Sequence, residues 1–267
     1  MRNLEPYDQR TMHLLSTRGV GMETLMSQSE QPLELELELL RAQGLNLTFN
    51  NGNYFFETKL QKFEDTTFCI VDIETNGSKS DEHQIIEIGA VKYKNGEIMD
   101  TYESFVKCNE IRTHISEITG ITLDDTLNAP ELKHVMQEFK LFLGYDIFVA
   151  HDIKFDYKFT SDMMKKCGLG ELKNRSLCTI ALAERSFSSF RYGLGYLNKT
   201  LTLHKEATHH RALSDALTAT KLLEYSLENM REKLRTPEDL ISYSKEAKRF
   251  KRPKFDPFIE EEVELKD

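Results

Sequence analysis

Phe68-Cys69-Ile70-Val71-Asp72-Ile73-Glu74-Thr75 is an apolar run that carries two acids. Side chains alternate between the two faces of a strand, so Asp72 and Glu74 would share a face with Ile70, about 7 Å apart along the strand. Two carboxylates on one face of an apolar strand are costly unless a positive group lies between them, and a divalent cation is the simplest such group. The stretch therefore predicts either a metal site or a strand end where both acids are solvated.

Composition places the chain among soluble globular proteins. Its 267 residues are 39% hydrophobic and 30% charged, enough for one large domain or two smaller ones. No apolar run approaches the roughly 20 residues of a membrane span, and the N-terminus has no signal-peptide pattern. The net charge of −9 argues against a general nucleic-acid coat, though not against an enzyme whose metal ions supply positive charge.

The cysteines indicate the compartment. They show no short paired spacing, which argues against a zinc site and against a disulfide framework. We therefore expect a reducing, cytoplasmic location. The four residues are Cys69, Cys108, Cys167 and Cys178.

Residues 1–64 are expected to form a small separate module. Residues 32–43 alternate Leu and Glu, but Pro32 at the start and Gly44 at the end favour a helix over a strand. Asn51-Gly52 then predicts a hairpin. Helices followed by a hairpin suggest a winged-helix-like shape. The third helix is acidic and would repel phosphate, so we expect protein contact or simple packing rather than DNA binding.

Residues 65–228 show strands that are followed by alternating helices and strands, which predicts an α/β domain with a mixed sheet and flanking helices. Apolar runs and turn signals such as Asn95-Gly96 determine the bounds of the expected strands and helices. The expected strands are 68–75, 84–93, 98–107, 146–151 and 176–178. The expected helices are 131–143, 153–166, 180–187, 194–200 and 212–229.

Residues 229–267 are expected to form a charged C-terminal tail. A basic block at 248–254 precedes an acidic block at Glu260–Glu262. Charge blocks of this kind are usually solvated and mobile. Three phenylalanines leave open a segment that docks onto a partner; they are Phe250, Phe255 and Phe258.

Three further residues could join the two strand acids. Asp156 is expected about one turn into the helix that follows His151, and Asp215 near the start of the last long helix. Each acid could instead be an exposed first-turn residue favoured by the helix dipole. His210 and Asp215 would be about 140° apart on one continuous helix, so they share a site only if His210 lies in the preceding loop.

Taken together, three motifs in order resemble the DEDD exonuclease family in its histidine subclass. They are Asp72-Ile73-Glu74, His151-Asp152-Ile153-Lys154-Phe155-Asp156 and His210-Arg211-Ala212-Leu213-Ser214-Asp215. The chain looks most similar to the proofreading exonucleases related to the epsilon subunit of bacterial DNA polymerase III, over roughly Asp65 to Glu228. Supporting matches are 85–91, 119–122 and 128–130. The family more often has Asn at the position of Asp152, which is not expected to hold metal.

The resemblance implies a ribonuclease H-like fold with a five-stranded mixed sheet, and a reaction that removes nucleotides from a 3′ end as 5′-monophosphates. It implies two Mg²⁺ or Mn²⁺ ions, held by Asp72, Glu74, Asp156 and Asp215. His210 would take a proton from the attacking water, because a histidine with an unperturbed pKa of about 6.5 suits that role near neutral pH. The implied substrate-binding residues are Thr75, Asn76, Gly77, Thr119, His151 and Phe155.

The sequence therefore predicts a metal-dependent 3′–5′ exonuclease that acts on DNA 3′ ends, single-stranded or in a frayed primer, in proofreading or repair. A replicative DNA polymerase subunit is the expected protein partner. One alternative is a 3′–5′ RNA exonuclease on the same fold, since discrimination of the 2′-hydroxyl depends on local contacts. A second is a non-catalytic, polymerase-associated binding subunit that retains the fold.

Overall fold

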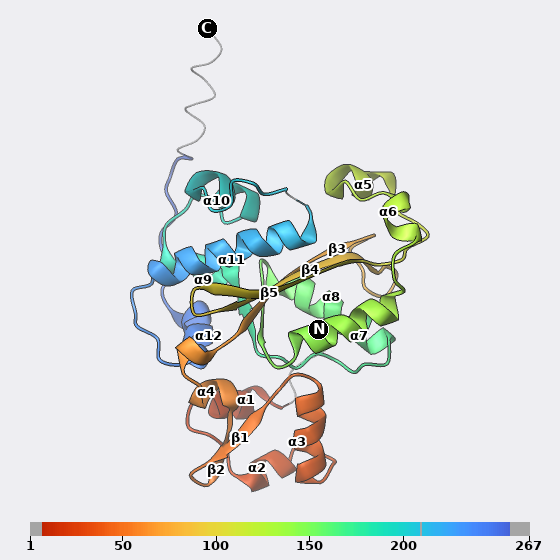
Figure 1. The fold of residues 1–267 in the computed structure, drawn as a ribbon. Helices are drawn as coiled ribbons and strands as arrows, with labels where there is room; N and C mark the ends of the chain where they lie inside the picture. The colour runs from red at the N-terminus through yellow and green to blue at the C-terminus, as the bar shows by residue number, and fades with distance from the viewer. Residues whose placement is uncertain (1–6, 209, 257–267) are drawn as a thin grey trace.

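The computed structural model describes residues 7–208 and 210–256. Its larger part is a five-stranded sheet with helices on both faces; its smaller part, at the bottom of Figure 1, contains helices and a two-stranded hairpin. Residues 1–6 of the predicted module and the predicted acidic block Glu260–Glu262 lie outside the described residues. Within the described ranges, no helix has the length and apolar character required to cross a bilayer.

The sheet has the order β5-β4-β3-β6-β7, with β3 at its centre. β3 pairs antiparallel with β4 and parallel with β6, so the predicted mixed five-stranded sheet is confirmed. Asn95 and Gly96 both have positive φ, as a tight two-residue hairpin turn requires. The strands are β3 Phe68–Thr75, β4 Ile85–Lys94, β5 Glu97–Phe105, β6 Ile147–Ala150 and β7 Ser176–Cys178.

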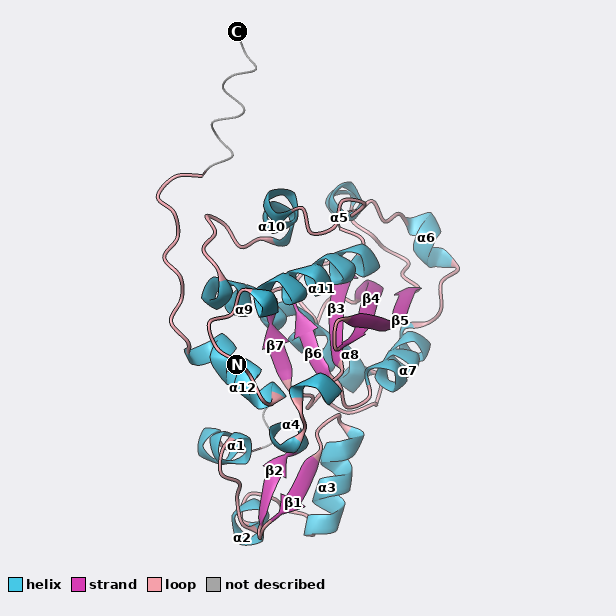
Figure 2. Ribbon diagram, turned by 60° about the vertical axis from the view of Figure 1, so that its left-hand side comes forward, coloured by secondary structure: helices cyan, strands magenta, loops and turns pink. Residues whose placement is uncertain are grey.

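Helices cover both faces of this sheet because β3 is apolar on both sides (Figure 2). Val71 and Ile73 pack against α7 and α8, whereas Ile70 on the other face packs against α11. Asp72 and Glu74 thus lie on the α11 side, as their alternation with Val71 and Ile73 predicts. The helices of this part are α5 Thr113–Thr119, α6 Leu123–Leu127, α7 Leu132–Leu143, α8 Ile153–Lys166, α9 Thr179–Ser186, α10 Leu194–Leu201 and α11 Ala212–Glu228.

The small module has its own hydrophobic cluster. The alternating stretch from Leu33 is helical, and Leu33 and Leu40 are buried on one face. Val20 forms a β-bridge with Tyr54, which adds a third short segment to the hairpin, as in a winged helix. Its elements are α1 Gln9–Ser16, α2 Met22–Met26, α3 Leu33–Ala42, β1 Leu47–Asn50, β2 Asn53–Phe56, α4 Glu57–Leu60 and the 3-10 turn η1 Phe63–Asp65.

The structure differs from the predicted mobile tail. Pro237–Glu246 forms helix α12, which begins with a capping box between Thr236 and Asp239. Leu240 and Ile241 are buried in the same cluster as Ile70 of β3. The basic stretch beyond α12 lies along α9, where Phe250 N–H donates to the Glu184 carbonyl at 2.8 Å. The prediction of a charged tail thus missed a short helix that contributes to the core before the basic block begins.

A buried ion pair joins α12, the sheet and the small module. Arg175, just before β7, contacts both Glu238 oxygens at 2.7 and 2.8 Å, and Thr58 donates to the same carboxylate at 2.6 Å. The Arg175 guanidinium also lies 4.2 Å from the centre of the Phe56 ring. Lys173 N–H donates to the Gln43 carbonyl at 2.8 Å. The small module is therefore fastened to the sheet domain by specific polar contacts.

Candidate active site

Three elements bring the four predicted acids to one end of the sheet. Asp72 and Glu74 lie in the second half of β3. Asp156 is in the first turn of α8 and is 5% exposed, and Asp215 is in the first turn of α11 and is 8% exposed. Each acid contributes to the electrostatic environment of Asp72, so the chain brings all four together.

A glycine of β4 brings α11 close enough to place Asp215. Gly89 is the cross-strand partner of Asp72. A Cβ at Gly89 would lie 2.1 Å from the backbone nitrogen of Leu213, so the first turn of α11 packs directly on the β4 backbone. Any side chain at this position would push α11, and Asp215 with it, away from β3.

Glu87 fixes the loop before α11. Its carboxylate is 0% exposed, accepts from Arg211 Nη2 at 2.7 Å and also accepts from Ala212 N–H at 3.0 Å. It thus neutralises Arg211 and caps the N-terminus of α11 in one contact set. The sequence analysis quoted Glu87 only as part of a motif match. An acid inside the apolar strand Ile85–Lys94 was the signal that could have identified its positioning role.

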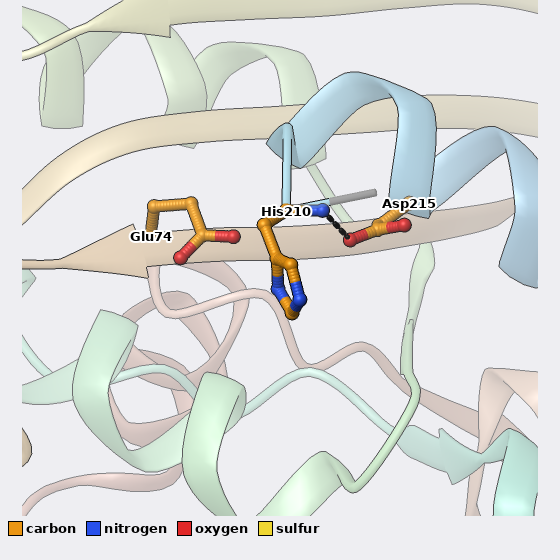
Figure 3. Close-up of side chains that lie close together, drawn as sticks. All are labelled: Glu74, His210 and Asp215. Carbon is orange, nitrogen blue, oxygen red and sulfur yellow. Dashed lines mark hydrogen bonds between the residues drawn. The ribbon is translucent and has the colours of Figure 1, made fainter. Parts of the chain in front are cut away.

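His210 lies in the loop before α11, which is the placement that sharing a site with Asp215 requires. Its φ is +60°, and its N–H donates to Asp215 Oδ2 at 2.9 Å. One ring nitrogen and single carboxylate oxygens of Glu74 and Asp215 lie within 4.8 Å of one another. Figure 3 shows the exposed imidazole projecting between the two acids. A left-handed conformation at a non-glycine residue is strained and is characteristic of functional sites.

The carboxylates are held in an environment that favours their protonated forms. Burial, followed by the charges of Asp156 and Asp215, raises the pKa of Asp72 well above its usual range. Burial and the charge of Asp215 raise the pKa of Glu74 to about 8. Burial raises the pKa of Asp156 to about 7, against backbone hydrogen bonds that lower it. Without an added positive charge, these acids therefore cannot all ionise cheaply near neutral pH.

The donor set fits divalent cations. No lysine or arginine in residues 7–208 and 210–256 forms an ion pair with Asp72, Glu74 or Asp156. Arg211, the nearest guanidinium, is committed to Glu87 and only lowers the pKa of Glu74 from a distance. Converging carboxylate oxygens that lack a cationic side chain are the ligands that hard cations such as Mg²⁺ and Mn²⁺ prefer.

Three of the predicted substrate-binding residues line an open cleft of about 400 Å³ next to the acids: Thr75, Gly77 and Phe155. Phe155 is 38% exposed and packs against Phe159 with 5.4 Å between ring centres. Gly77 was expected to permit close approach to a nucleotide. In the structure its α-carbon lies against His83 of the same loop, since a Cβ there would come within 2.3 Å of the ring.

Two other predicted substrate residues have structural contacts. Asn76 accepts from Gln84 N–H at 2.9 Å through its side-chain oxygen and donates to the Glu110 carbonyl at 3.2 Å. Thr119 is 6% exposed and its hydroxyl bonds to the Ile115 carbonyl at 2.9 Å. Their side chains thus support the walls of the cleft, which leaves the backbone of Asn76 for the contact that the sequence predicts.

His151 lies where β6 ends, and it is kept neutral. Burial lowers its pKa to about 4, and its Nδ1 lies 2.9 Å from the Thr179 hydroxyl. The next residue, Asp152, has φ +71°, a left-handed conformation that Asn and Asp tolerate better than other side chains. Asn, which the resemblance leads one to expect at this position, would tolerate the same conformation.

Comparisons with known proteins agree with this geometry. The family model described as Exonuclease (RNase_T) matches residues 69–223, more than half of the chain. A DNA polymerase III PolC-type protein of Halalkalibacterium halodurans is 38% identical over 161 residues, covering 60% of this chain and 11% of that protein. Another, of Thermotoga petrophila, is 39% identical over 165 residues, covering 61% and 12%. The chain thus spans about a tenth of the length of these relatives.

Two solved structures share the fold. Exonuclease X in complex with 5′-overhanging duplex DNA has a TM-score of 0.54 at 25% identity, covering 66% of this chain and 99% of that chain. E. coli exonuclease I in complex with a dA16 oligonucleotide has a TM-score of 0.56 at 14% identity, covering 67% and 43%. The carboxylate cluster lies inside the matched region of the family model, and the chain belongs to this exonuclease family.

Proposed function

We propose that this chain is a metal-dependent 3′–5′ exonuclease that removes nucleotides from DNA 3′ ends as 5′-monophosphates. One observation carries the proposal: four carboxylates from β3, α8 and α11 converge with no cationic side chain paired to Asp72, Glu74 or Asp156 in the described part of the chain. A His at the exposed rim completes the set. Membership of the exonuclease family supports the reaction class.

Asp72, Glu74, Asp156 and Asp215 would hold two divalent cations. Such a pair supplies charge stabilisation to both the attacking and the leaving oxygens of a phosphodiester. Asp72 is central in this set, because the other three acids all surround it. The raised pKa values of Glu74 and Asp156 describe the protein without cations, and bound cations would favour the ionised forms of both.

His210 would accept the proton of the attacking water. Its imidazole lies at the exposed edge of the acid cluster, where water can reach it, and Asp215 holds its backbone through a 2.9 Å hydrogen bond. His151 would not share this role, because burial lowers its pKa to about 4, which makes it a weak proton acceptor, and its Nδ1 lies against the Thr179 hydroxyl. Thr75, Gly77 and Phe155 would contact the terminal nucleotide in the cleft next to the acids.

DNA is proposed as the substrate because the relatives are DNA polymerase III PolC-type proteins, and exonuclease X is described in complex with DNA. The same relatives suggest that this chain works beside a replicative polymerase on primer ends. Both statements concern a chain that matches about a tenth of those relatives' length, so they need direct tests.

The test follows shortening of 5′-labelled strands of one sequence: matched primer, mismatched primer, single-stranded DNA and RNA. Each is incubated with Mg²⁺, Mn²⁺ or chelator, beside Asp72→Ala. We expect stepwise, metal-dependent shortening of DNA, faster at a mismatch, with 5′-monophosphate as the product and no activity in Asp72→Ala.

Other results would change the proposal in defined ways. Selective loss of RNA would assign the site to RNA processing. No shortening of any strand would refute the exonuclease, and calorimetric titration with Mn²⁺ would then show whether the acids still bind metal in a non-catalytic protein. If addition of a replicative polymerase accelerates mismatch removal, that result would support the proposed partnership.

A further inference from the structure

A second charged feature lies directly beside the acids. The cleft that begins at Thr75 is lined by Lys79, His83, Arg112 and His114, with Glu82 as its acid. A smaller depression of about 270 Å³ adjoins it and shares Ser78, Lys79 and Phe155. Its remaining lining includes Lys154, Lys158 and Asp81. The two depressions thus present four lysines and arginines against two carboxylates, in a chain whose net charge is −9.

The two cations that line the larger cleft, Lys79 and Arg112, are available to a ligand. Arg112 is exposed and forms no ion pair within residues 7–208 and 210–256. Lys79 contacts Glu82 at 2.8 Å, but both side chains are more than half exposed, at 64% and 55%. Exposed pairs of this kind contribute little to stability, so a ligand phosphate can compete for the lysine.

The loop that carries Lys79 is held in place. Ser80 contacts Asp162 of α8 through its hydroxyl, and Lys166 of the same helix donates to the Ser80 carbonyl. At the other end, His83 Nδ1 lies 3.1 Å from the Lys79 carbonyl, and the His83 ring rests on Gly77. These contacts fix the backbone of Lys79, which lines both depressions, and Arg112 at the start of α5 lines the larger one.

We propose that Lys79 and Arg112 form a second phosphate-binding site, for a phosphate of the strand end other than the scissile one. The proposal rests on the proposed exonuclease function. The scissile phosphate belongs at the carboxylates, whereas the lining of this cleft begins one residue beyond Glu74 and includes none of the four acids. A guanidinium and an ammonium group that line one cleft are suited to hold a phosphate.

The electrostatics of the chain explain why such a site is useful. Clustered carboxylates and a negative net charge repel a DNA strand. Local cations beside the acids would offset that repulsion and set the position of the strand end. The phosphate has two sources: the internal phosphate upstream of the scissile bond, or a 3′-terminal phosphate on a damaged end. Both sources would present a phosphate group to the site. Substrates that carry only one of the two phosphates distinguish the sources.

The experiment compares four thymidine substrates with the full chain and Mn²⁺. Thymidine 5′-p-nitrophenyl phosphate and d(TpT) carry only the scissile phosphate. The trinucleotide d(TpTpT) adds an internal phosphate, and d(TpTp) adds a 3′-terminal one. The variants are Arg112→Ala and Lys79→Ala, with Arg112→Lys to restore the charge. Arg18→Ala, an exposed arginine of the small module, is the matched control.

We expect Arg112→Ala and Lys79→Ala to lower kcat/KM on one longer substrate about tenfold relative to d(TpT), as the loss of one charged hydrogen bond does. Arg112→Lys should recover part of that ratio, and Arg18→Ala should leave it unchanged. A selective loss on d(TpTpT) identifies the internal phosphate, and a selective loss on d(TpTp) identifies the terminal one. Ratios that stay within twofold for both variants on both longer substrates would overturn the site.

Binding gives a second readout that separates this proposal from the proposed function. A fluorescent oligothymidylate is titrated onto each protein at several salt concentrations, and its anisotropy is followed. Loss of one phosphate contact should reduce the slope of log affinity against log salt by about 0.7 for single-stranded DNA. If the wild-type chain hydrolyses none of the four substrates, the exonuclease proposal fails. The anisotropy slopes then decide the phosphate site alone, with equal slopes refuting it.

Discussion

The buried acid Glu238 and the acids of the candidate site are treated in opposite ways in this molecule. Glu238 of α12 is 1% exposed, and its two oxygens receive Arg175 and Thr58, so its charge is neutralised inside the protein. Asp72, Glu74 and Asp156 have no such partner among the described residues, and burial raises the pKa of each. The first arrangement is complete in the chain itself. The second, under the proposed function, is completed by bound cations.

This contrast separates a structural use of a buried acid from a functional one. A paired carboxylate holds elements together. Removing one partner of the pair leaves the other as a buried charge without a counter-charge, which destabilises the protein. A cluster of unpaired carboxylates lowers the stability of the metal-free protein, and its oxygens remain available to bind a ligand. Glu87 shows that both uses can lie side by side, because it neutralises Arg211 and thereby positions the loop of the functional cluster.

The strongest test of this contrast is Asp72→Asn. We expect exonuclease activity to fall at least about 1,000-fold, because loss of several kcal/mol of charge stabilisation corresponds to about three powers of ten in rate. In chelator, the same variant should be more stable than wild type by about 1–2 kcal/mol, since it removes one of four repelling acids. Single-turnover primer degradation and urea unfolding measure the two effects.

Asp65→Asn, an exposed acid just before β3, serves as the control and should change neither quantity. A loss of stability in Asp72→Asn in chelator would contradict the description of Asp72 as a carboxylate that destabilises the metal-free protein.

The opposite effect on stability is expected at the buried ion pair between Glu238 and Arg175. Glu238→Gln should lower the free energy of unfolding by about 3–5 kcal/mol, because it breaks the buried ion pair between Glu238 and Arg175. Activity per folded molecule should be retained, as Glu238 lies outside the acid cluster. Urea unfolding followed by circular dichroism measures the change, with the exposed Glu246→Gln of the same helix as control. Equal stability of the two variants would show that the pair is not what fastens α12.

Much of this organisation was predictable from sequence, because it depends on local pattern. The five strands, the long helices and the helical state of the Leu/Glu stretch follow from periodicity and turn residues such as Asn51-Gly52. The shared face of Asp72 and Glu74 follows from strand alternation. That His210 must precede the last helix follows from the 3.6-residue period.

What could not be predicted depends on contacts between distant segments. Glu87 and Arg211 are 124 residues apart, and Glu238 and Arg175 are 63 apart, so no local pattern links either pair. The approach of α11 to Gly89 is visible only when the helix lies on the strand. Helix α12 lies between charged segments, whose composition suggested a solvated tail.

Substitution of His210 separates two proposed contributions to activity: charge stabilisation by the carboxylates and proton transfer by His210. His210→Gln should lower activity about 100-fold, in the range of a lost general base, while the carboxylates stay in place. Metal affinity measured by Mn²⁺ calorimetry should change far less than in Asp72→Asn. The control is His13→Gln, an exposed histidine of α1. A loss as large as that of Asp72→Asn, together with lost Mn²⁺ binding, would instead make His210 chiefly a metal ligand.

The smallest expected effect is the pH dependence of stability in chelator. Glu74 and Asp156 have folded-state pKa values of about 8 and about 7, above their ordinary values of 4.5 and 3.8. The folded protein therefore binds more protons than the unfolded chain in this window. The stability that protonation supplies is fully present below the unfolded pKa values and is lost as pH rises through the folded ones.

The free energy of unfolding should therefore fall as pH rises from about 4.5 to about 8. The contributions of other ionisable groups to the pH dependence cancel when Glu74→Gln is compared with wild type at each pH. The substitution removes the contribution of Glu74 and should therefore flatten the decline in the free energy of unfolding. Glu97→Gln, at an exposed position of β5, should leave the decline intact. Mg²⁺ binds ionised carboxylates and should stabilise the wild-type protein more at pH 8 than at pH 5. A wild-type curve that rises relative to Glu74→Gln as pH increases would mean that this acid is already neutralised within the chain, as Glu238 is.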